Sequence, residues 1–414
     1  MDHRTSAWPI PSDRFGSPGV ILMSSDRDRL LILSSIPVFT EGLVWAAGLS
    51  NRECWVMSDE IAPPSWDRLP HVLGVEPMSR QELEAVDESL LESVIRACAV
   101  REIGIVVAAD TRSNRLVHRL VDRLPPTVEP FPMCSEGLFE RLYDKGSFAE
   151  LLVDLEIPRP KTAIVSSEAE VRAIELSPPY ILKPCQGESG DGIITVASTQ
   201  ELHAEVTRRA RIGDVPLVVQ ELIPGEDIDL SVLADHGRCI AWTIQQNEGT
   251  GQKRFVLNDQ VLALGKRIIE GTGYHGVAHF DMRIDHRNGE ILVIEANPRF
   301  WGTLSYSVWS GVNFLDLGIR MMRGEDLTSV FREVECVCPY LGVTRGSIVR
   351  DLLGGWPVPK NLSAPQKRAW RFHHRRGSGA SRASALAWIA RVNRPHRSLP
   401  MSSARAAVGR WLLR

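Results

Sequence analysis

Two apolar segments joined by a short polar turn constrain the second half of this chain more than any other feature. Residues 277–284 and 290–296 have the composition of strands, and residues 285–289 (DHRNG) lie between them. An Asn-Gly pair between two such segments is typical of a β-hairpin. The region is therefore predicted to be antiparallel and to belong to an α+β fold.

The predicted hairpin carries three oxygen-bearing side chains that can converge on one metal. Because side chains alternate along a strand, Asp281 lies on one face of the first strand, and Glu295 shares a face with Asn297 on the second. Mg²⁺ prefers octahedral oxygen ligands, typically one or two carboxylates together with phosphate oxygens. The three residues are therefore candidate ligands of a magnesium–nucleotide site. An exposed polar strand face is the alternative, but the apolar run before Asn297-Pro298-Arg299 favours a buried site.

A glycine-rich loop follows another apolar strand. Lys183 lies in the strand predicted at residues 180–184, and residues 187–192 (GESGDG) come soon after it. Backbone N–H groups in such a loop can wrap phosphates, and a lysine at its mouth supplies positive charge. The chain has no GxxxxGK[ST] motif, so this is not a Walker A loop. Taken alone, such a loop is more often a turn than a phosphate site.

A third segment, residues 217–227, runs from an apolar strand into a Pro-Gly turn rimmed by acidic residues. Exposed backbone at such a strand end can pair with an adenine edge, and an acidic residue nearby can bind ribose hydroxyls. In isolation, a structural turn is the better interpretation. Lys145, at the start of a predicted helix, is by itself typical of a surface lysine.

The first 130 residues follow a different pattern, in which strands alternate with helices. Strands are predicted at residues 20–23, 53–58 and 103–108, and helices at residues 27–49 and 79–100. This alternation indicates βαβ units and a doubly wound parallel sheet. No GxGxxG follows the first strand, so the dinucleotide-binding form of that fold has little support.

Charge is distributed unevenly along the 414 residues, although the formal net charge is only −3. No acidic residue follows Asp351, and the 13 Lys and Arg residues beyond it give a tail of +13 against a body of −16.

The composition, 43% hydrophobic and 24% charged, is that of a globular protein. No run of 18 apolar residues predicts a membrane span. Seven cysteines without a CxxC pair indicate reduced thiols in a cytoplasmic protein.

Five motifs in this order resemble the ATP-grasp superfamily over roughly residues 120–325. They are Lys145, Lys183-Pro184 with the glycine-rich loop, QELIPGED, HFDMRID and VIEANPRFWG. The NPRFWG ending is similar to the carboxylate–amine ligase and carbamoyl-phosphate-synthase-like branch.

The resemblance implies an α/β, Rossmann-like parallel-sheet domain followed by a two-lobed α+β ATP-grasp domain. The expected division is a disordered leader at 1–17, the first domain at 18–130, the ATP-grasp domain at 131–330 with lobes at about 158–222 and 223–330, and a helical or irregular extension at 331–414 that is basic after residue 351.

The resemblance also implies a role for each matching residue. ATP phosphates are expected at Lys145 and Lys183, beneath a mobile loop that includes Gly187, Glu188 and Gly190. Adenine is expected at Glu221, Leu222 and Ile223, and ribose at Asp227. Two Mg²⁺ ions, replaceable by Mn²⁺, are expected at Asp281, Glu295 and Asn297. Arg299 and Lys183 are the expected catalytic residues.

The activity implied is ATP-dependent ligation of a small-molecule or peptide carboxylate to an amine through an acylphosphate. Three alternatives stay open: activation of bicarbonate or carbamate, phosphotransfer on the same fold, and an inactive nucleotide-binding protein. For the basic tail, a solvated extension is the simplest interpretation. An anionic membrane surface or an acidic partner is the sharper hypothesis, and nucleic acid ranks third because no recognition motif accompanies the charge. A homodimer is left open.

Overall fold

The computed structural model describes residues 28–58, 69–188, 190–248 and 252–338. The predicted strand at 20–23, the leader and the basic tail lie outside these ranges. The first domain has a five-stranded parallel sheet with strand order β3-β2-β1-β4-β5. Its strands are β1 (Leu30–Ser34), β2 (Cys54–Ser58), β3 (Val72–Pro77), β4 (Ile105–Ala108) and β5 (Glu129–Pro130).

The prediction of a helix at 27–49 was wrong in its first part, because Leu30–Ser34 forms the central strand of this sheet. All five of its residues are buried, since helices cover both faces of a doubly wound sheet. The helix predicted at 79–100 is two helices, separated at Val86, which has a left-handed φ of 41°. The helices of the domain are α1 (Pro37–Leu49), α2 (Arg80–Ala85), α3 (Glu88–Val100) and α4 (Thr111–Leu120), followed by the 3-10 turn η3 (Val121–Arg123).

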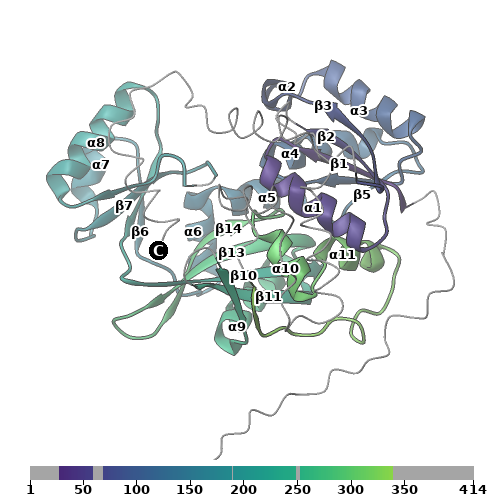
Figure 1. The fold of residues 1–414 in the computed structure, drawn as a ribbon. Helices are drawn as coiled ribbons and strands as arrows, with labels where there is room; N and C mark the ends of the chain where they lie inside the picture. The colour runs from purple at the N-terminus through teal and green to yellow at the C-terminus, as the bar shows by residue number, and fades with distance from the viewer. Residues whose placement is uncertain (1–27, 59–68, 189, 249–251, 339–414) are drawn as a thin grey trace, which may run out of the picture.

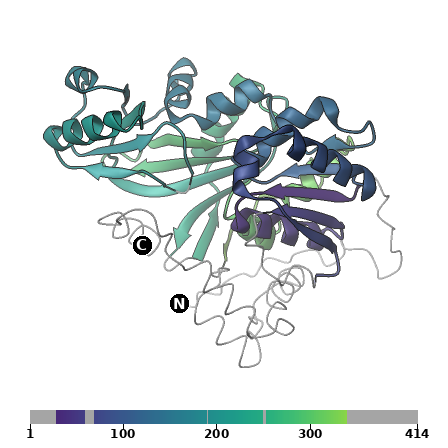
Figure 2. The same cartoon turned by 90° about the horizontal axis from the view of Figure 1, so that it is seen from above.

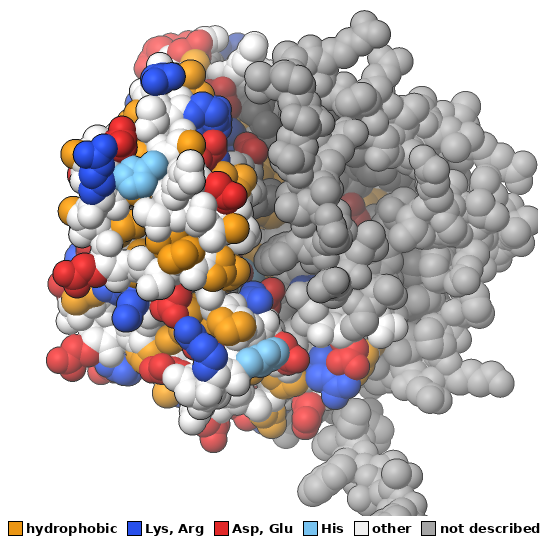
Figure 3. All heavy atoms as spheres, turned by 90° about the vertical axis from the view of Figure 1, so that its left-hand side faces the viewer, with side chains coloured by type: hydrophobic (Ala, Val, Ile, Leu, Met, Phe, Trp, Pro, Cys, Tyr) orange, Lys and Arg blue, Asp and Glu red, His pale blue; other side chains and the backbone are white. Residues whose placement is uncertain are grey.

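A second sheet, of four antiparallel strands, forms a separate small lobe with strand order β6-β9-β7-β8. Two helices cover its outer face through a cluster that includes Val171 and Leu202. Acidic and basic side chains are mixed on the exposed face of this lobe (Figure 3), as in the ion pair of Glu205 and Arg208. The elements are β6 (Thr162–Val165), α7 (Glu168–Ala173), β7 (Tyr180–Pro184), β8 (Ile194–Val196), α8 (Thr199–Arg211) and β9 (Leu217–Glu221).

A six-stranded antiparallel sheet lies between the other two units (Figures 1 and 2). Its order is β14-β13-β10-β11-β12-β15, and the predicted hairpin forms its β13–β14 edge. Apolar residues of one face, including Leu230 and Phe280, pack with α9. The elements are β10 (Gly225–Asp235), β11 (Arg238–Glu248), β12 (Gln252–Val256), α9 (Asp259–Thr272), β13 (Gly276–Asp285), β14 (Ile291–Asn297) and β15 (Cys336–Cys338).

Four more helices join these units. The helices α5 (Glu136–Tyr143) and α6 (Lys145–Asp154) lead from the first domain toward β14, and α10 (Leu304–Ser310) and α11 (Phe314–Met322) pack against α1. Arg52 also pairs with Asp316 of α11 at 3.0 Å. The parallel-sheet domain is thus fastened to residues that follow the hairpin, which brings its loops near Arg299. The domain boundaries drawn from the sequence stay predictions.

Among the described residues, no helix is both long and apolar enough to cross a membrane. All seven cysteines are free thiols, and burial raises the pKa of Cys54 and Cys98 to about 12. These two thiols therefore stay protonated near neutral pH.

Candidate active site

The polar face of the six-stranded sheet carries a row of four side chains on adjacent strands. Strand register places Gln245 opposite Asp229, Asp229 opposite Asp281, and Asp281 opposite Glu295. Directly opposed side chains on one face lie about 5 Å apart at their Cβ atoms. Burial and the neighbouring Asp281 raise the pKa of Asp229 to about 6. The row therefore concentrates carboxylates in a place where they repel one another unless a cation is present.

Hydrogen bonds order the end of this row that was predicted to bind metal. Asn297 Nδ2 donates to Asp281 Oδ2 at 3.1 Å, and His279 Nε2 lies 3.3 Å from Asp281 Oδ1. Burial opposes ionisation of Asp281, but the hydrogen bonds from His279 and Asn297 outweigh it and lower its pKa. Asp281, Glu295 and Asn297 thus lie together, as the alternation predicted. His279 also bonds Ser231 Oγ through Nδ1 at 2.9 Å, so both of its ring nitrogens have partners.

Two lysines from different elements point to this row. Lys145, at the start of α6, lies 3.4 Å from Glu295 Oε1 and donates to the carbonyl of Gly187 at 2.9 Å. Lys183, on β7, is 2% exposed and donates to Gln220 Oε1 at 3.0 Å. Burial lowers the pKa of Lys183 to about 8, although the Glu295 carboxylate partly opposes that shift. Lys145 is itself buried, so the interpretation of a surface lysine is wrong.

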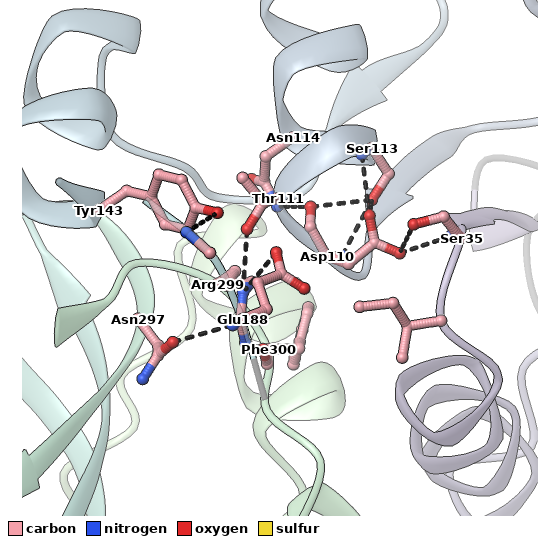
Figure 4. Close-up of polar contacts among 12 residues, drawn as sticks. Ser35, Asp110, Thr111, Ser113, Asn114, Tyr143, Glu188, Asn297, Arg299 and Phe300 are labelled. Atoms are coloured by element: carbon pink, nitrogen blue, oxygen red, sulfur yellow. Dashed lines mark hydrogen bonds and ion pairs between the residues drawn. The ribbon is translucent and has the colours of Figure 1, made fainter. Parts of the chain in front are cut away.

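Arg299 lies at the junction of the loop, the hairpin and the first domain (Figure 4). It is 5% exposed, and it donates to Asn297 Oδ1 at 2.8 Å and, through Nε, to Thr111 Oγ1 at 3.2 Å. Glu188 of the glycine-rich loop approaches it with Oε1 3.7 Å from Nε. Both oxygens of Glu188 are buried without a hydrogen-bond partner among the described residues. A carboxylate is therefore held beside a guanidinium without being fully satisfied.

The loop itself starts against α5. The Gly187 N–H donates to the Tyr143 hydroxyl at 3.1 Å, and Gly190 has a φ of 74°, a left-handed conformation that favours glycine. The loop is thus anchored at its first residue, next to Lys145.

The predicted adenine and ribose residues run from the end of β9 to the start of β10, and arginines contact Glu221, Ile223 and Asp227. Glu221 Oε1 accepts from Arg287 at 2.7 Å. Asp227 accepts from Arg283, which also donates to the carbonyl of Ile223 at 2.9 Å. Leu222 N donates to the carbonyl of Pro179 at a long 3.4 Å. The structure thus brings these residues together at one rim.

Sequence reasoning missed several residues of this face. Asp229 and Ser231 alternate with buried Ile228 and Leu230 on β10, and that period-2 pattern was available in the sequence. Gln245 had no such signal, because only the strand register places it beside Asp229, to which its Nε2 donates at 3.3 Å.

Comparisons with known proteins show what this chain is similar to in sequence and fold. Residues 214–338 match a family described as ATP-grasp in the biosynthetic pathway with Ter operon. A D-aspartate ligase of Enterococcus faecium (strain Aus0004) is 27% identical over 260 residues, which are 56% of this chain and 59% of that protein. The arginine-specific large chain of carbamoyl phosphate synthase from Geobacillus stearothermophilus is 24% identical over 280 residues, 61% of this chain and 25% of that one. The chain thus spans less than two thirds of either relative.

Among solved structures, the biotin carboxylase domain of 2-oxoglutarate carboxylase from Hydrogenobacter thermophilus superimposes with a TM-score of 0.58. It is 17% identical, and the match covers 73% of this chain and 70% of that one. At this identity the likeness concerns the fold. Over residues 214–338 the chain is thus similar to an ATP-grasp family, and its fold is similar to that of the biotin carboxylase domain.

Proposed function

We propose that this protein is an ATP-dependent ligase that activates a carboxylate as an acylphosphate and joins it to an amine, with release of ADP and phosphate. The proposal rests chiefly on the meeting of two buried lysines, Lys145 and Lys183, with the carboxylate row that ends at Glu295. Cations for phosphate oxygens and carboxylates for a divalent metal lie in one place, as phosphoryl transfer requires. A relative named D-aspartate ligase supports the same class.

Magnesium fits the donor set. Asp281 and Glu295 offer carboxylate oxygens, and hard oxygen donors are those that Mg²⁺ prefers. The amide oxygen of Asn297, which accepts from Arg299 here, would be the third ligand. We assign two Mg²⁺ ions to this set, with Mn²⁺ as a substitute. Bound there with ATP, the metal would neutralise phosphate charge. The biotin carboxylase domain was solved with MgADP, which supports this assignment by analogy of fold.

The nucleotide is assigned from the residues at the start of β10 to the glycine-rich loop. Glu221, Leu222 and Ile223 would hold adenine, and Asp227 would hold ribose. Arg287 and Arg283 already orient the carboxylates of Glu221 and Asp227. Lys145, Lys183 and the loop with Gly187, Glu188 and Gly190 would hold the phosphates.

The chemistry then follows from charge and position. An oxygen of the substrate carboxylate bonds to the γ-phosphorus while the bond to the ADP oxygen breaks. The amine nitrogen next bonds to the acyl carbon, phosphate leaves with the electron pair, and the amine loses a proton. Lys183 and buried Arg299 stabilise negative charge that develops in these steps, with little reorganisation because both side chains are already held.

Purified protein supplied with MgATP provides the test of the proposal. ADP release should require an acid and an amine together, and the product mass should equal their sum less one water. ADP release with one substrate and a stable phosphorylated product would instead establish phosphotransfer. ADP release that depends on bicarbonate would establish bicarbonate as the acid that is activated. ATP binding without any turnover would support an inactive nucleotide-binding protein.

The basic tail and the assembly state are separate parts of the proposal. The tail lies outside the described residues, and its charge of +13 favours an anionic membrane surface or an acidic partner. We assign the protein to the cytoplasm, at the membrane periphery if the tail binds lipid, and leave a homodimer as its candidate assembly. Truncation after Leu362 should abolish sedimentation with anionic vesicles and leave ligase activity unchanged. Equal sedimentation of the truncated chain would remove the lipid role.

A further inference from the structure

A second group of metal-ligating side chains lies at the far end of the large sheet. Asp235 ends β10 and His236 follows it in the turn to β11, while His275 comes from the link between α9 and β13. Asp235 lies six residues along the strand from Asp229, which is about 20 Å of extended chain. This cluster is therefore separate from the candidate active site.

The two distances from Asp235 to the histidines match donor separations in a tetrahedral transition-metal site. Asp235 Oδ1 lies 3.2 Å from His236 Nδ1 and 3.4 Å from His275 Nδ1, and all three donor atoms lie within 4.8 Å of one another. Zn²⁺ binds nitrogen and oxygen ligands at about 2.0–2.1 Å, so tetrahedral donors lie about 3.3 Å apart. One ion could contact the carboxylate and both imidazoles after small side-chain rotations.

The surroundings favour a built site over an incidental ion pair. Arg238 holds the other carboxylate oxygen, Asp235 Oδ2, at 3.0 Å, which leaves Oδ1 turned to the histidines. His275 Nδ1 is buried and makes no hydrogen bond within the described part of the chain. The two imidazole rings lie with centroids 4.1 Å apart. Two rings so close, sharing one carboxylate oxygen, form an arrangement that a bridging cation explains directly.

The backbone around the cluster is also arranged for a close approach of the two segments. Gly237 N donates to the carbonyl of Tyr274 at 2.8 Å, and a Cβ on Gly237 would lie 3.4 Å from the Cα of Gly273. His236 has a left-handed φ of 46°, and its side chain lies 3.2 Å from Asp235 in this turn. A metal here would therefore link two segments that already touch.

We propose that Asp235, His236 and His275 form a structural site for a divalent transition metal of the zinc class, with water in the fourth position. Two imidazoles and one carboxylate select Zn²⁺, Co²⁺ or Ni²⁺ over Mg²⁺, which prefers oxygen ligands. The ion clips the β10–β11 turn to the α9–β13 link. His236 is 77% exposed, so an ion can enter from solvent. This inference does not depend on the proposed ligase activity.

The experiment is a titration of the chelator-treated full chain with ZnCl₂ alone, followed by calorimetry, and with CoCl₂, followed by visible absorption. The test variant is His236→Ala, whose exposed side chain makes misfolding a minor risk, and the second is His275→Ala. The control is His203→Ala, a histidine 3.9 Å from Glu168 in the small lobe. Since Asp229, His279 and Asp281 also offer three donors, Asp281→Asn is titrated in parallel.

The wild-type chain is expected to bind one Zn²⁺. The affinity for Zn²⁺ should fall at least about 100-fold in His236→Ala and should be unchanged in His203→Ala and Asp281→Asn. Zn²⁺ should raise the melting temperature of the wild type and of both control variants, but not that of His236→Ala. Unchanged zinc affinity in His236→Ala, or loss of binding in Asp281→Asn alone, would overturn the proposal.

Discussion

Two carboxylates in the region of Arg299 differ in how many hydrogen bonds they accept (Figure 4). Asp110, at the start of α4, accepts hydrogen bonds from Ser35 N, Ser34 Oγ and Ser113 N. Glu188, on the glycine-rich loop, is 11% exposed and has no hydrogen bond among the described residues, with Arg299 Nε at 3.7 Å (Figure 4). Unsatisfied buried groups are rare in native proteins because each costs about 1–3 kcal/mol. The difference separates a carboxylate with several hydrogen bonds from one that faces only a guanidinium.

The position of Asp110 indicates that the usual ligand site of the parallel sheet does not bind nucleotide in this protein. Ligands of doubly wound sheets bind beyond the carboxyl ends of strands, where the strand order reverses. In this sheet that point lies between β1 and β4. The Asp110 carboxylate occupies it and accepts the Ser35 N–H that an anion would otherwise bind. The parallel sheet thus supplies its own anion at that point, whereas in the second region Lys145 lies beside the Glu295 carboxylate.

The largest expected effect on the second region comes from Glu295→Gln. The change removes one metal-directed charge and little volume, so turnover should fall by about 10³-fold or more while the melting temperature stays near that of the wild type. Steady-state ADP release and thermal unfolding measure the two quantities. Glu290→Gln, at an exposed position beside the hairpin turn, serves as the matched control and should keep full activity. Wild-type rates in Glu295→Gln would remove the metal assignment.

Arg299→Ala tests the residue that Glu188 approaches and whose Nε donates to Thr111. The rate should fall by about 10²-fold or more, with a smaller change in ATP affinity, because the guanidinium is proposed to stabilise charge in the chemical step. Single-turnover rates and ATP binding are compared, with Arg299→Lys as the charge-conserving control. A loss confined to ATP binding would exclude Arg299 from chemistry.

Asp110→Asn tests the satisfied carboxylate. The free energy of unfolding should fall by about 1–3 kcal/mol, because buried donors such as Ser35 N lose a charged acceptor. Activity per folded molecule should change little. Asp87→Asn is the matched control, since that aspartate also caps a helix but accepts one bond, from Leu90 N at 2.9 Å. Urea unfolding measures the loss of stability in both variants. Equal losses would mean that the burial of Asp110 adds nothing to its contribution to stability.

The smallest expected effect is a pH dependence of the ATP affinity, caused by the titration of Lys183. Its pKa of about 8 lies below the usual 10.5, so the free protein loses this proton above pH 8, and ATP affinity should fall by up to tenfold per pH unit there. Between pH 8 and 10.5 the unfolded chain binds more protons than the folded one, so this group makes the free energy of unfolding rise with pH. Calorimetric ATP titrations from pH 7 to 9.5 measure the affinity. Lys183→Arg should give a flat profile, and a flat wild-type profile would contradict the assignment.

Much of the fold could be predicted locally. The apolar run that opens residues 217–227 and the Asn-Gly turn after β13 predicted strands at the right residues. The errors came where local pattern is ambiguous. Leu30–Ser34 is a short apolar run that reads as helix or strand, and only its burial between layers decides.

By itself, the sequence determined the motif order, the alternation that gathers Asp281, Glu295 and Asn297, and the charge imbalance of the tail. The tertiary structure decided what neighbours those residues have. Lys145 is buried beside Glu295, Arg299 reaches Thr111, and His275 faces Asp235 only because distant segments pack together. The physical reason is that alternation along a strand is a local property of the backbone. Strand register, burial and the resulting pKa shifts depend on contacts between residues far apart in the chain.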